Sequence, residues 1–168
     1  MKIIRSILAL FLFSGAFIAC SPVQSQEKSQ DMDESRISQL VSSRTFVFQA
    51  QTVFPMRGRN RQIAGDGYDV VVSRDTVNSF LPYFGRAFTA PMDPTKGGIQ
   101  FVSKDFEYKE EAGKQGGWNI TVKPNDVQDV QQLYFTISRD GYASLQVTST
   151  NRQPISFNGI IREKRDRR

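Results

Sequence analysis

The amino-acid sequence predicts a mainly β fold: about eight strands in a strongly curved antiparallel meander, with one short N-terminal helix. Apolar and polar residues alternate in eight short runs between residues 46 and 161, a pattern typical of antiparallel sheets with one buried face. Residues that favour turns separate most of these runs. Eight strands in about 120 residues have to curl or fold over to bury their apolar face. A barrel-like sheet and a two-layer sandwich both meet this requirement.

The short helix is expected over residues 31–43. Acidic residues crowd its start, where the helix dipole favours negative charge. Ile37, Leu40 and Val41 follow at the spacing i, i+3, i+4 and form one apolar stripe. We therefore expect this helix to pack against an end or an open face of the sheet.

After the helix, the period of the apolar residues changes from about 3.6 to 2, as strands require. Each run is defined by side chains that point to one face and alternate with the side chains of the other face. The eight runs are marked by Phe46/Phe48/Ala50, Tyr68/Val70/Val72, Ile99/Phe101, Phe106/Tyr108, Trp118/Ile120/Val122, Leu133/Phe135/Ile137, Ala143/Leu145/Val147 and Ile155/Phe157/Gly159.

The connections between these runs predict hairpins. Asp140-Gly141 lies between two alternating runs, which is the strongest short-range hairpin signal in the chain. Turns are also expected at residues 103–105, 113–117, 124–129 and 151–154. Together these turns predict a meander in which each strand from the third onward pairs with the next.

Two segments do not fit the strand pattern. Residues 54–62 are expected to form a long loop that carries Arg57, Arg59 and Arg61 at alternate positions. Residues 77–88 form an aromatic connector in which Pro82 argues against one long helix. We expect a helical turn over residues 75–81, followed by an ordered aromatic turn at Gly85.

The N-terminus indicates export. Two basic residues, an apolar stretch of about a dozen residues and the small Ala19 fit a secretory signal peptide over residues 1–19. Cys20, directly after Ala19, resembles the lipobox cysteine of bacterial lipoproteins, although Phe17 departs from the usual Leu. The resemblance implies that Cys20 is acylated, for example with palmitate, and becomes the new N-terminus. The alternatives are an ordinary signal peptide that is cut after Ser25, and an uncleaved anchor, for which the stretch is short.

The expected organisation follows from this processing site. Residues 20–33 are polar and read as a flexible tether. Residues 34–163 form a single β-rich domain, and residues 164–168 form a basic tail. Two or more acyl chains on Cys20 would give stable residence in a membrane. Ser21 in place of Asp resembles outer-membrane sorting, so we expect an outer-membrane lipoprotein that faces the periplasm.

Charge and composition exclude several function classes. The net charge of +5 is concentrated at the two ends of the chain, which argues against a nucleic-acid partner. The basic tail is read either as a solvated end or as a contact for anionic lipid headgroups. The chain contains no histidine, and its single cysteine lies in the processing site. Ser-His-Asp and Cys-His catalysis are therefore excluded, and we expect neither an enzyme nor a cofactor.

Acidic residues form no convincing catalytic or metal site. Glu107, Glu110 and Glu111 are interpreted as exposed hairpin charges, because glycoside cleavage needs two carboxylates that flank a cleft. Asp126 and Asp129 lack the ligand spacing of a calcium loop. We therefore predict no metal site.

The aromatic connector carries the resemblance to a known family. Its segment Leu81–Ala87 resembles the signature of the bacterial exported proteins called domain of unknown function 4251. Seven further segments match in order: residues 46–50 followed by Pro55, and residues 67–70, 98–101, 106–108, 118–120, 141–145 and 151–159. The likeness covers about residues 35–163 and implies small β-rich exported proteins, often lipoproteins, without an established activity. It supplies no catalytic residue to carry over.

The best candidate for a binding surface is Tyr83, Phe84 and Arg86, because Tyr and Arg are common binding anchors. Alternatively, the aromatic residues cap one end of the sheet while Arg86 pairs with Asp66 or Asp69. Arg57, Arg59 and Arg61 share one side of an extended segment and could bind phosphate or a glycan carboxylate, or could belong to a solvated loop.

Taken together, these observations predict a non-catalytic structural or adaptor module of the cell envelope that is anchored to a membrane through Cys20. The alternative is a binding protein for a small apolar or lipid ligand. An apolar-ligand binder should leave a cavity unfilled, whereas an adaptor should have a packed interior and an exposed apolar patch. The abundance of Phe in the sequence favours the packed interior.

Overall fold

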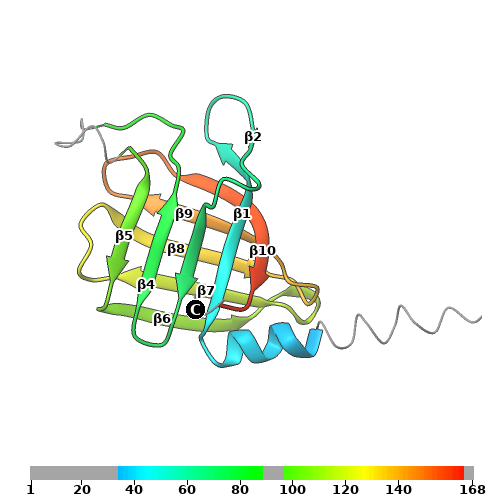
Figure 1. The fold of residues 1–168 in the computed structure, drawn as a ribbon. Helices are drawn as coiled ribbons and strands as arrows, with labels where there is room; N and C mark the ends of the chain where they lie inside the picture. The colour runs from blue at the N-terminus through cyan, green and yellow to red at the C-terminus, as the bar shows by residue number, and fades with distance from the viewer. Residues whose placement is uncertain (1–33, 89–96, 165–168) are drawn as a thin grey trace, which may run out of the picture.

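A single antiparallel sheet of ten strands curls into a nearly closed barrel (Figure 1). The computed structural model describes residues 34–88 and 97–164. The strands follow each other around the barrel in the order β5-β4-β3-β1-β10-β9-β8-β7-β6, and β2 pairs with β1 beside this path. The prediction of a strongly curved antiparallel fold with one short helix is confirmed, and of the two architectures the chain adopts the barrel-like one.

The strands alternate buried and more exposed residues along most of their length. The helix occupies residues 34–42 of the described chain, and the expected residues 31–33 lie outside the described residues. The strands are β1 (Phe46–Pro55), β2 (Arg61–Gln62), β3 (Asp69–Val72), β4 (Val77–Leu81), β5 (Ile99–Ser103), β6 (Phe106–Ala112), β7 (Trp118–Pro124), β8 (Val130–Ile137), β9 (Tyr142–Ser149) and β10 (Ile155–Arg162), with a short 3-10 turn η1 at Lys114–Gly116.

The barrel has two layers that cross each other, with β3, β4 and β5 in front of β6 to β9 in the view of Figure 1. Its interior is filled by aliphatic and aromatic side chains. Phe135 of β8 meets Phe46 and Phe48 of β1 edge-to-face, at centroid distances of 5.9 and 5.8 Å, an arrangement that aromatic rings prefer. All three side chains are fully buried, so the space between the layers at this level is occupied.

A sharp bend where β1 meets β10 lets the sheet curl. The register between them shifts between Ala50 and Thr52, and such bulges increase local twist and curvature. Opposite the bulge, Gly159 lies so close to Gln49 that a Cβ atom would collide with its carbonyl oxygen. The absence of a side chain at Gly159 thus permits the two strands to approach at the bend.

The N-terminal helix packs against one end of the barrel, as the apolar stripe predicted (Figure 1). Ile37 and Val41 are buried in the core, and Leu40 packs against it. The helix lies over the β8–β9 hairpin, where the predicted Asp140-Gly141 turn places Gly141 at φ +79°. A Cβ atom at Gly141 would be 2.8 Å from the Cδ1 atom of Ile37. The turn therefore needs glycine at position 141 for two reasons: its backbone has a positive φ, and a side chain would collide with Ile37 of the helix.

The expected helical turn over residues 75–81 is wrong, because Val77–Leu81 forms strand β4. Val77, Ser79 and Leu81 face the interior. Ser79 can be buried there because its hydroxyl donates a hydrogen bond of 3.0 Å to the carbonyl oxygen of Ile99 on the neighbouring strand. An inward serine interrupts the apolar alternation, so the pattern of residues did not indicate a strand. The long loop expected over residues 54–62 is likewise shorter, because β1 extends to Pro55 and β2 begins at Arg61.

The predicted meander is confirmed from β6 to β10 but not between β5 and β6. These two strands follow one another in the chain through residues 103–105, yet they occupy the two edges of the sheet. The chain turns a corner there instead of forming a hairpin. The corner is held by Asp126, whose carboxylate accepts hydrogen bonds from the Ser103 hydroxyl and from the backbone N–H groups of Lys104 and Asp105.

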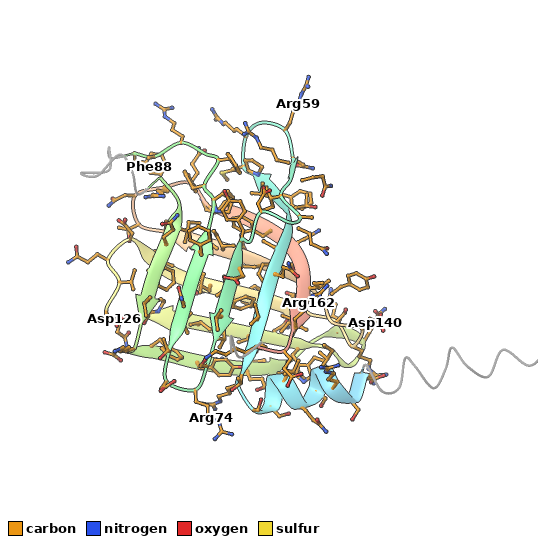
Figure 2. The ribbon with its side chains drawn as sticks, viewed as in Figure 1. Arg59, Arg74, Phe88, Asp126, Asp140 and Arg162 are labelled. Carbon is orange, nitrogen blue, oxygen red and sulfur yellow. The ribbon has the colours of Figure 1, made fainter. Side chains whose placement is uncertain are left out.

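The barrel has two distinct ends, and β1 runs from one to the other. Its ten residues span about 30 Å at the usual rise per residue of a strand. The helix end carries the N-terminal helix and Arg74, which donates to the carbonyl oxygen of Ser43. The opposite end carries Arg59 in the β1–β2 loop and Phe88 in the aromatic connector (Figure 2). We call this second end the loop end.

Candidate functional site

The aromatic connector at the loop end is fixed to the turn between β9 and β10. Ala87 and Arg152 form an isolated antiparallel bridge. The backbone N–H of Phe88 donates to the carbonyl oxygen of Asn151 at 2.8 Å, and that of Gln153 donates to Arg86 at 3.1 Å. The connector thus behaves as a short extra strand, which gives Arg86 a defined backbone position.

Tyr83 fastens the same turn from the inside. Its hydroxyl donates to the carbonyl oxygens of Arg86 at 2.9 Å and of Gln153 at 3.1 Å, which share the single proton. Gly85 passes so near that a Cβ atom would be 2.6 Å from the Tyr83 hydroxyl oxygen. Burial raises the pKa of Tyr83 above its ordinary value, although the bond to Gln153 and the charge of Arg152 act in the opposite direction. The hydroxyl therefore stays protonated and keeps donating near neutral pH.

Arg152 supports this arrangement from the β9–β10 turn. Its Nη1 atom donates to the carbonyl oxygen of Gly98 at 2.9 Å and to that of Gly97 at 3.3 Å. Its guanidinium lies 5.2 Å from the centroid of the Tyr83 ring, within the range of a cation–π contact. Arg152 therefore ties the connector to the start of β5.

The arginine-rich loop approaches the connector from the other side. Strand β2 pairs with β1 through Arg61 and Gln62, and buried Ile63 follows directly after it. Gly58 adopts φ +110° at the loop tip, a conformation open mainly to glycine. The Arg61 guanidinium lies 4.3 Å from the centroid of the Phe84 ring. This cation–π contact joins two segments that lie more than twenty residues apart in the chain.

Between the loop and the connector lies a groove of about 410 Å³, which we call the arginine groove. None of its lining residues is a carboxylate. None of its four arginines forms an ion pair with a described carboxylate. The groove is lined by Pro55, Arg57, Gly58, Arg59, Arg61, Phe84, Gly85, Arg86 and Gln153. Four arginine residues therefore line one groove without a counter-charge from the described part of the chain.

The structure places the residues singled out from the sequence in different roles. Phe84 and Arg86 line the arginine groove, whereas Tyr83 holds the turn that positions them. Arg86 pairs with neither Asp66 nor Asp69. The three loop arginines and the connector, two separate candidates in the sequence, form one site. Gln153 was missed, because no local sequence signal distinguishes it from other polar turn residues.

The acidic candidates do not form a site. Glu107, Glu110 and Glu111 are exposed on β6, and Glu111 pairs with Lys109 at 2.8 Å. Asp126 holds the β5–β6 corner, where the Ser103 hydroxyl, its strongest influence, and the two backbone amides lower the pKa of its carboxyl. Within residues 34–88 and 97–164, no three acidic or other potential ligand residues cluster closely enough to hold a metal ion.

A second groove, of about 660 Å³, lies between the helix and the strands β9 and β10. It carries both signs of charge, since Asp140 and Glu163 line it together with Arg36, Arg162 and Lys164. Arg36 and Glu163 form an ion pair at 2.6 Å. The charges of this groove are therefore at least partly neutralised, unlike those of the arginine groove.

The outer face of the front layer exposes apolar side chains. Phe80 on β4 and Val102 on β5 point outward and are 44% and 56% exposed. Phe80 stacks on Tyr68 at a centroid distance of 5.6 Å. Surface residues of this kind are common on soluble domains when they occur singly, so this small cluster is a weaker candidate than the arginine groove.

The predicted lipidation residue Cys20, the signal peptide, the tether and residues 165–168 of the basic tail lie outside the described residues. Among the helices that the structure describes, none has the length and apolar character needed to span a membrane.

Comparisons with known proteins support the resemblance seen in the sequence. The model of the family DUF4251, "Domain of unknown function (DUF4251)", matches residues 28–161. A crystal structure of a DUF4251 family protein from Bacteroides eggerthii DSM 20697, at 1.95 Å resolution, is similar with a TM-score of 0.60. The similarity covers 82% of this chain and 92% of that chain at 15% sequence identity. No curated protein matches the chain.

Proposed function

The chain belongs to the DUF4251 family, and on this basis we propose that it is a non-catalytic adaptor lipoprotein of the cell envelope. In this proposal, Cys20 carries the lipid anchor in the outer membrane and the arginine groove is the surface that engages a partner. The domain faces the periplasm. Catalysis is not part of this role, since the chain has no histidine and the proposal assigns its single cysteine to the anchor.

The observation that carries the proposal is the convergence of the arginine loop and the aromatic connector on one groove. Arginine and aromatic side chains are enriched in the energetically important centres of protein interfaces. The same groove is built on backbone that the Tyr83 and Arg86 hydrogen bonds hold in place. A surface that is already ordered loses less conformational entropy when it binds.

The barrel interior favours the adaptor over a binder of small apolar ligands. Phe46, Phe48 and Phe135 occupy the centre of the barrel, in the space that an apolar ligand would need. Both grooves lie between surface elements. Arginines dominate the arginine groove, whereas the second groove combines charged residues with apolar ones. The partner is therefore expected at the surface, and an apolar ligand would find no room at the level of the three rings.

The two ends of the barrel suit a tethered adaptor. The described chain begins at the helix end, whereas the arginine groove lies at the loop end (Figures 1 and 2). A tether that enters at the helix end places the arginine groove at the end of the barrel farthest from the attachment point. The groove can thus reach components that lie further from the anchoring membrane.

Site-specific photo-crosslinking in living cells tests this proposal. A photo-crosslinking residue replaces Arg59, at the exposed tip of the loop, in the full-length chain. Discrete crosslinked products are expected in the envelope fraction on illumination, because the loop contacts the partner.

The matched control places the same residue at Lys123, which is exposed on β7 and does not line the groove. Products from position 59 only would support the proposal. Identical products from both positions, or none from position 59, would show that the groove is not the partner surface.

A further inference from the structure

We propose that the arginine groove is a phosphate-binding site that takes two neighbouring phosphate groups of a soluble ligand reaching the loop end. This inference rests on the proposed function, because it names the chemistry by which the adaptor surface recognises its partner. It assigns Arg57, Arg59 and Arg86 to direct contact with phosphate oxygens, and Arg61 with Phe84 to the floor of the site.

Charge balance favours phosphate over carboxylate. Four arginine residues line one groove of about 410 Å³, and none of its lining residues is a carboxylate. One carboxylate would neutralise a single arginine, whereas a phosphate monoester carries about −1.5 to −2 near neutral pH. Two neighbouring phosphates therefore carry about −3 to −4 together, close to the charge of the four arginines. Each guanidinium presents planar pairs of N–H donors that match phosphate oxygens.

The residue type and the anchoring of the side chains agree with this chemistry. All four cations are arginines, although the chain also contains lysines. The Arg61 guanidinium is stacked on Phe84 at 4.3 Å, and its backbone is held by the β1–β2 pairing. The Arg86 carbonyl oxygen accepts bonds from Tyr83 and Gln153. The side chain of Arg61 and the backbone of Arg86 are therefore held in place before a ligand arrives.

The position of the groove favours a soluble source of phosphate. In Figure 2, Arg59 stands at the opposite end of the barrel from Arg74 and the helix. A tether that enters at the helix end attaches at the far end of the barrel from the groove. A dissolved phosphate-bearing molecule can reach the loop end freely.

Binding of pyrophosphate to the full chain, purified in a non-ionic detergent, tests the proposal. Pyrophosphate is the probe because it holds two phosphates side by side. Calorimetry at physiological ionic strength should show saturable binding. The variant Arg57→Gln/Arg59→Gln/Arg86→Gln should lose roughly tenfold or more in affinity, because it lacks three charge-assisted donors. Arg61 is kept, so that its packing on Phe84 is preserved.

The matched control is Lys104→Gln/Lys114→Gln/Lys123→Gln, which removes the same number of positive charges from exposed positions outside the groove. Affinity should stay within about twofold of the original, since distant exposed charges are screened by salt. A second measurement needs no variant: pyrophosphate should shift the Nε–Hε NMR signals of the groove arginines and leave those of Arg74 and Arg162 in place.

Any of the following four results would overturn the inference. Equal losses in both triple variants would mean unspecific charge attraction, and absence of pyrophosphate binding would mean that there is no phosphate site. Equal binding of citrate would assign the groove to polycarboxylates. Competition by phosphatidic acid in the micelles would assign it to lipid headgroups. If any of these occurs while crosslinking from position 59 persists, the adaptor proposal stands and only the phosphate chemistry is wrong.

Discussion

The hydroxyl group of Tyr83 shows how one polar atom can organise a surface. It donates its single proton to two carbonyl oxygens, those of Arg86 and Gln153. A phenylalanine would fill the same space but leave both carbonyls without this donor. Gly85 has to lack a side chain for the hydroxyl to approach. Tyr83 is thus a positioning residue, and variants that probe binding should spare it.

A second position where a missing side chain decides the structure is Gly159. We predict that Gly159→Ala lowers the free energy of unfolding by about 1–3 kcal/mol, the usual cost of overpacking, because its Cβ atom would collide with the Gln49 carbonyl oxygen. Denaturant unfolding followed by the fluorescence of Trp118 measures the change.

The control for this prediction is Gly97→Ala, where a Cβ atom would meet nothing within 4 Å. Equal stability of Gly159→Ala and the unmodified chain would contradict the account of the bend between β1 and β10.

At the level of single residues, the sequence predicted which side chains matter but not where they meet. Phe84 and Arg86 were identified from residue type, and so were the loop arginines. That Arg61 would stack on Phe84 could not be predicted, because the contact depends on how the β1–β2 hairpin leans over the sheet. The roles of Tyr83 and Gln153 depend on the same tertiary contact.

Among the secondary-structure elements, those with strict apolar alternation were predicted and those with exceptions were missed. From β6 to β10, each strand pairs with the next strand in the chain, so their apolar alternation and the turns between them were enough to predict the meander. Strand β4 was missed because its central inward residue is Ser79. Strands β5 and β6 were expected to pair because they are close in sequence, but they are the two edge strands of the sheet and do not pair. Which strands become the edges depends on the whole sheet and not on one turn.

The β5–β6 corner provides a prediction that depends on pH. Hydrogen bonds from Ser103, Lys104 and Asp105 lower the pKa of the Asp126 carboxyl in the folded chain. A lowered pKa contributes stability above the pKa of the unfolded chain, and this contribution is lost as the pH falls through the folded pKa. Asp126→Asn should therefore lower the melting temperature at neutral pH, since its amide nitrogen would face backbone N–H donors.

Melting curves between neutral pH and the acidic range test this expectation. The difference between Asp126→Asn and the unmodified chain should narrow as the pH falls below the ordinary titration range of aspartic acid. Asp129→Asn is the control, because the side chain of Asp129 is exposed and only its backbone carbonyl accepts a bond. A difference that does not change with pH would show that the charge of Asp126 does not hold the corner.

For the whole molecule, the separation of the helix end from the loop end links the fold to the proposed anchoring. We predict that Cys20→Ala moves the chain from the membrane fraction to the soluble fraction, because the multiple acyl chains that hold a protein stably would be absent. Fractionation and palmitate labelling of cells that produce the full-length chain measure this. The control chain with Ser21→Ala should remain in the membrane fraction and keep its palmitate label. A membrane-bound, unlabelled Cys20→Ala chain would indicate an uncleaved anchor instead.

The pairing of the first long strand with the last has a consequence for the order of events in folding. Val47 of β1 pairs with Arg162 of β10, so the middle of the sheet joins residues from opposite ends of the domain. Contacts of such high sequence separation form late and slow the folding of β proteins. The barrel cannot close until the ribosome has released β10. We therefore expect the newly made chain to remain open during synthesis, a state compatible with threading through a secretion channel before it folds.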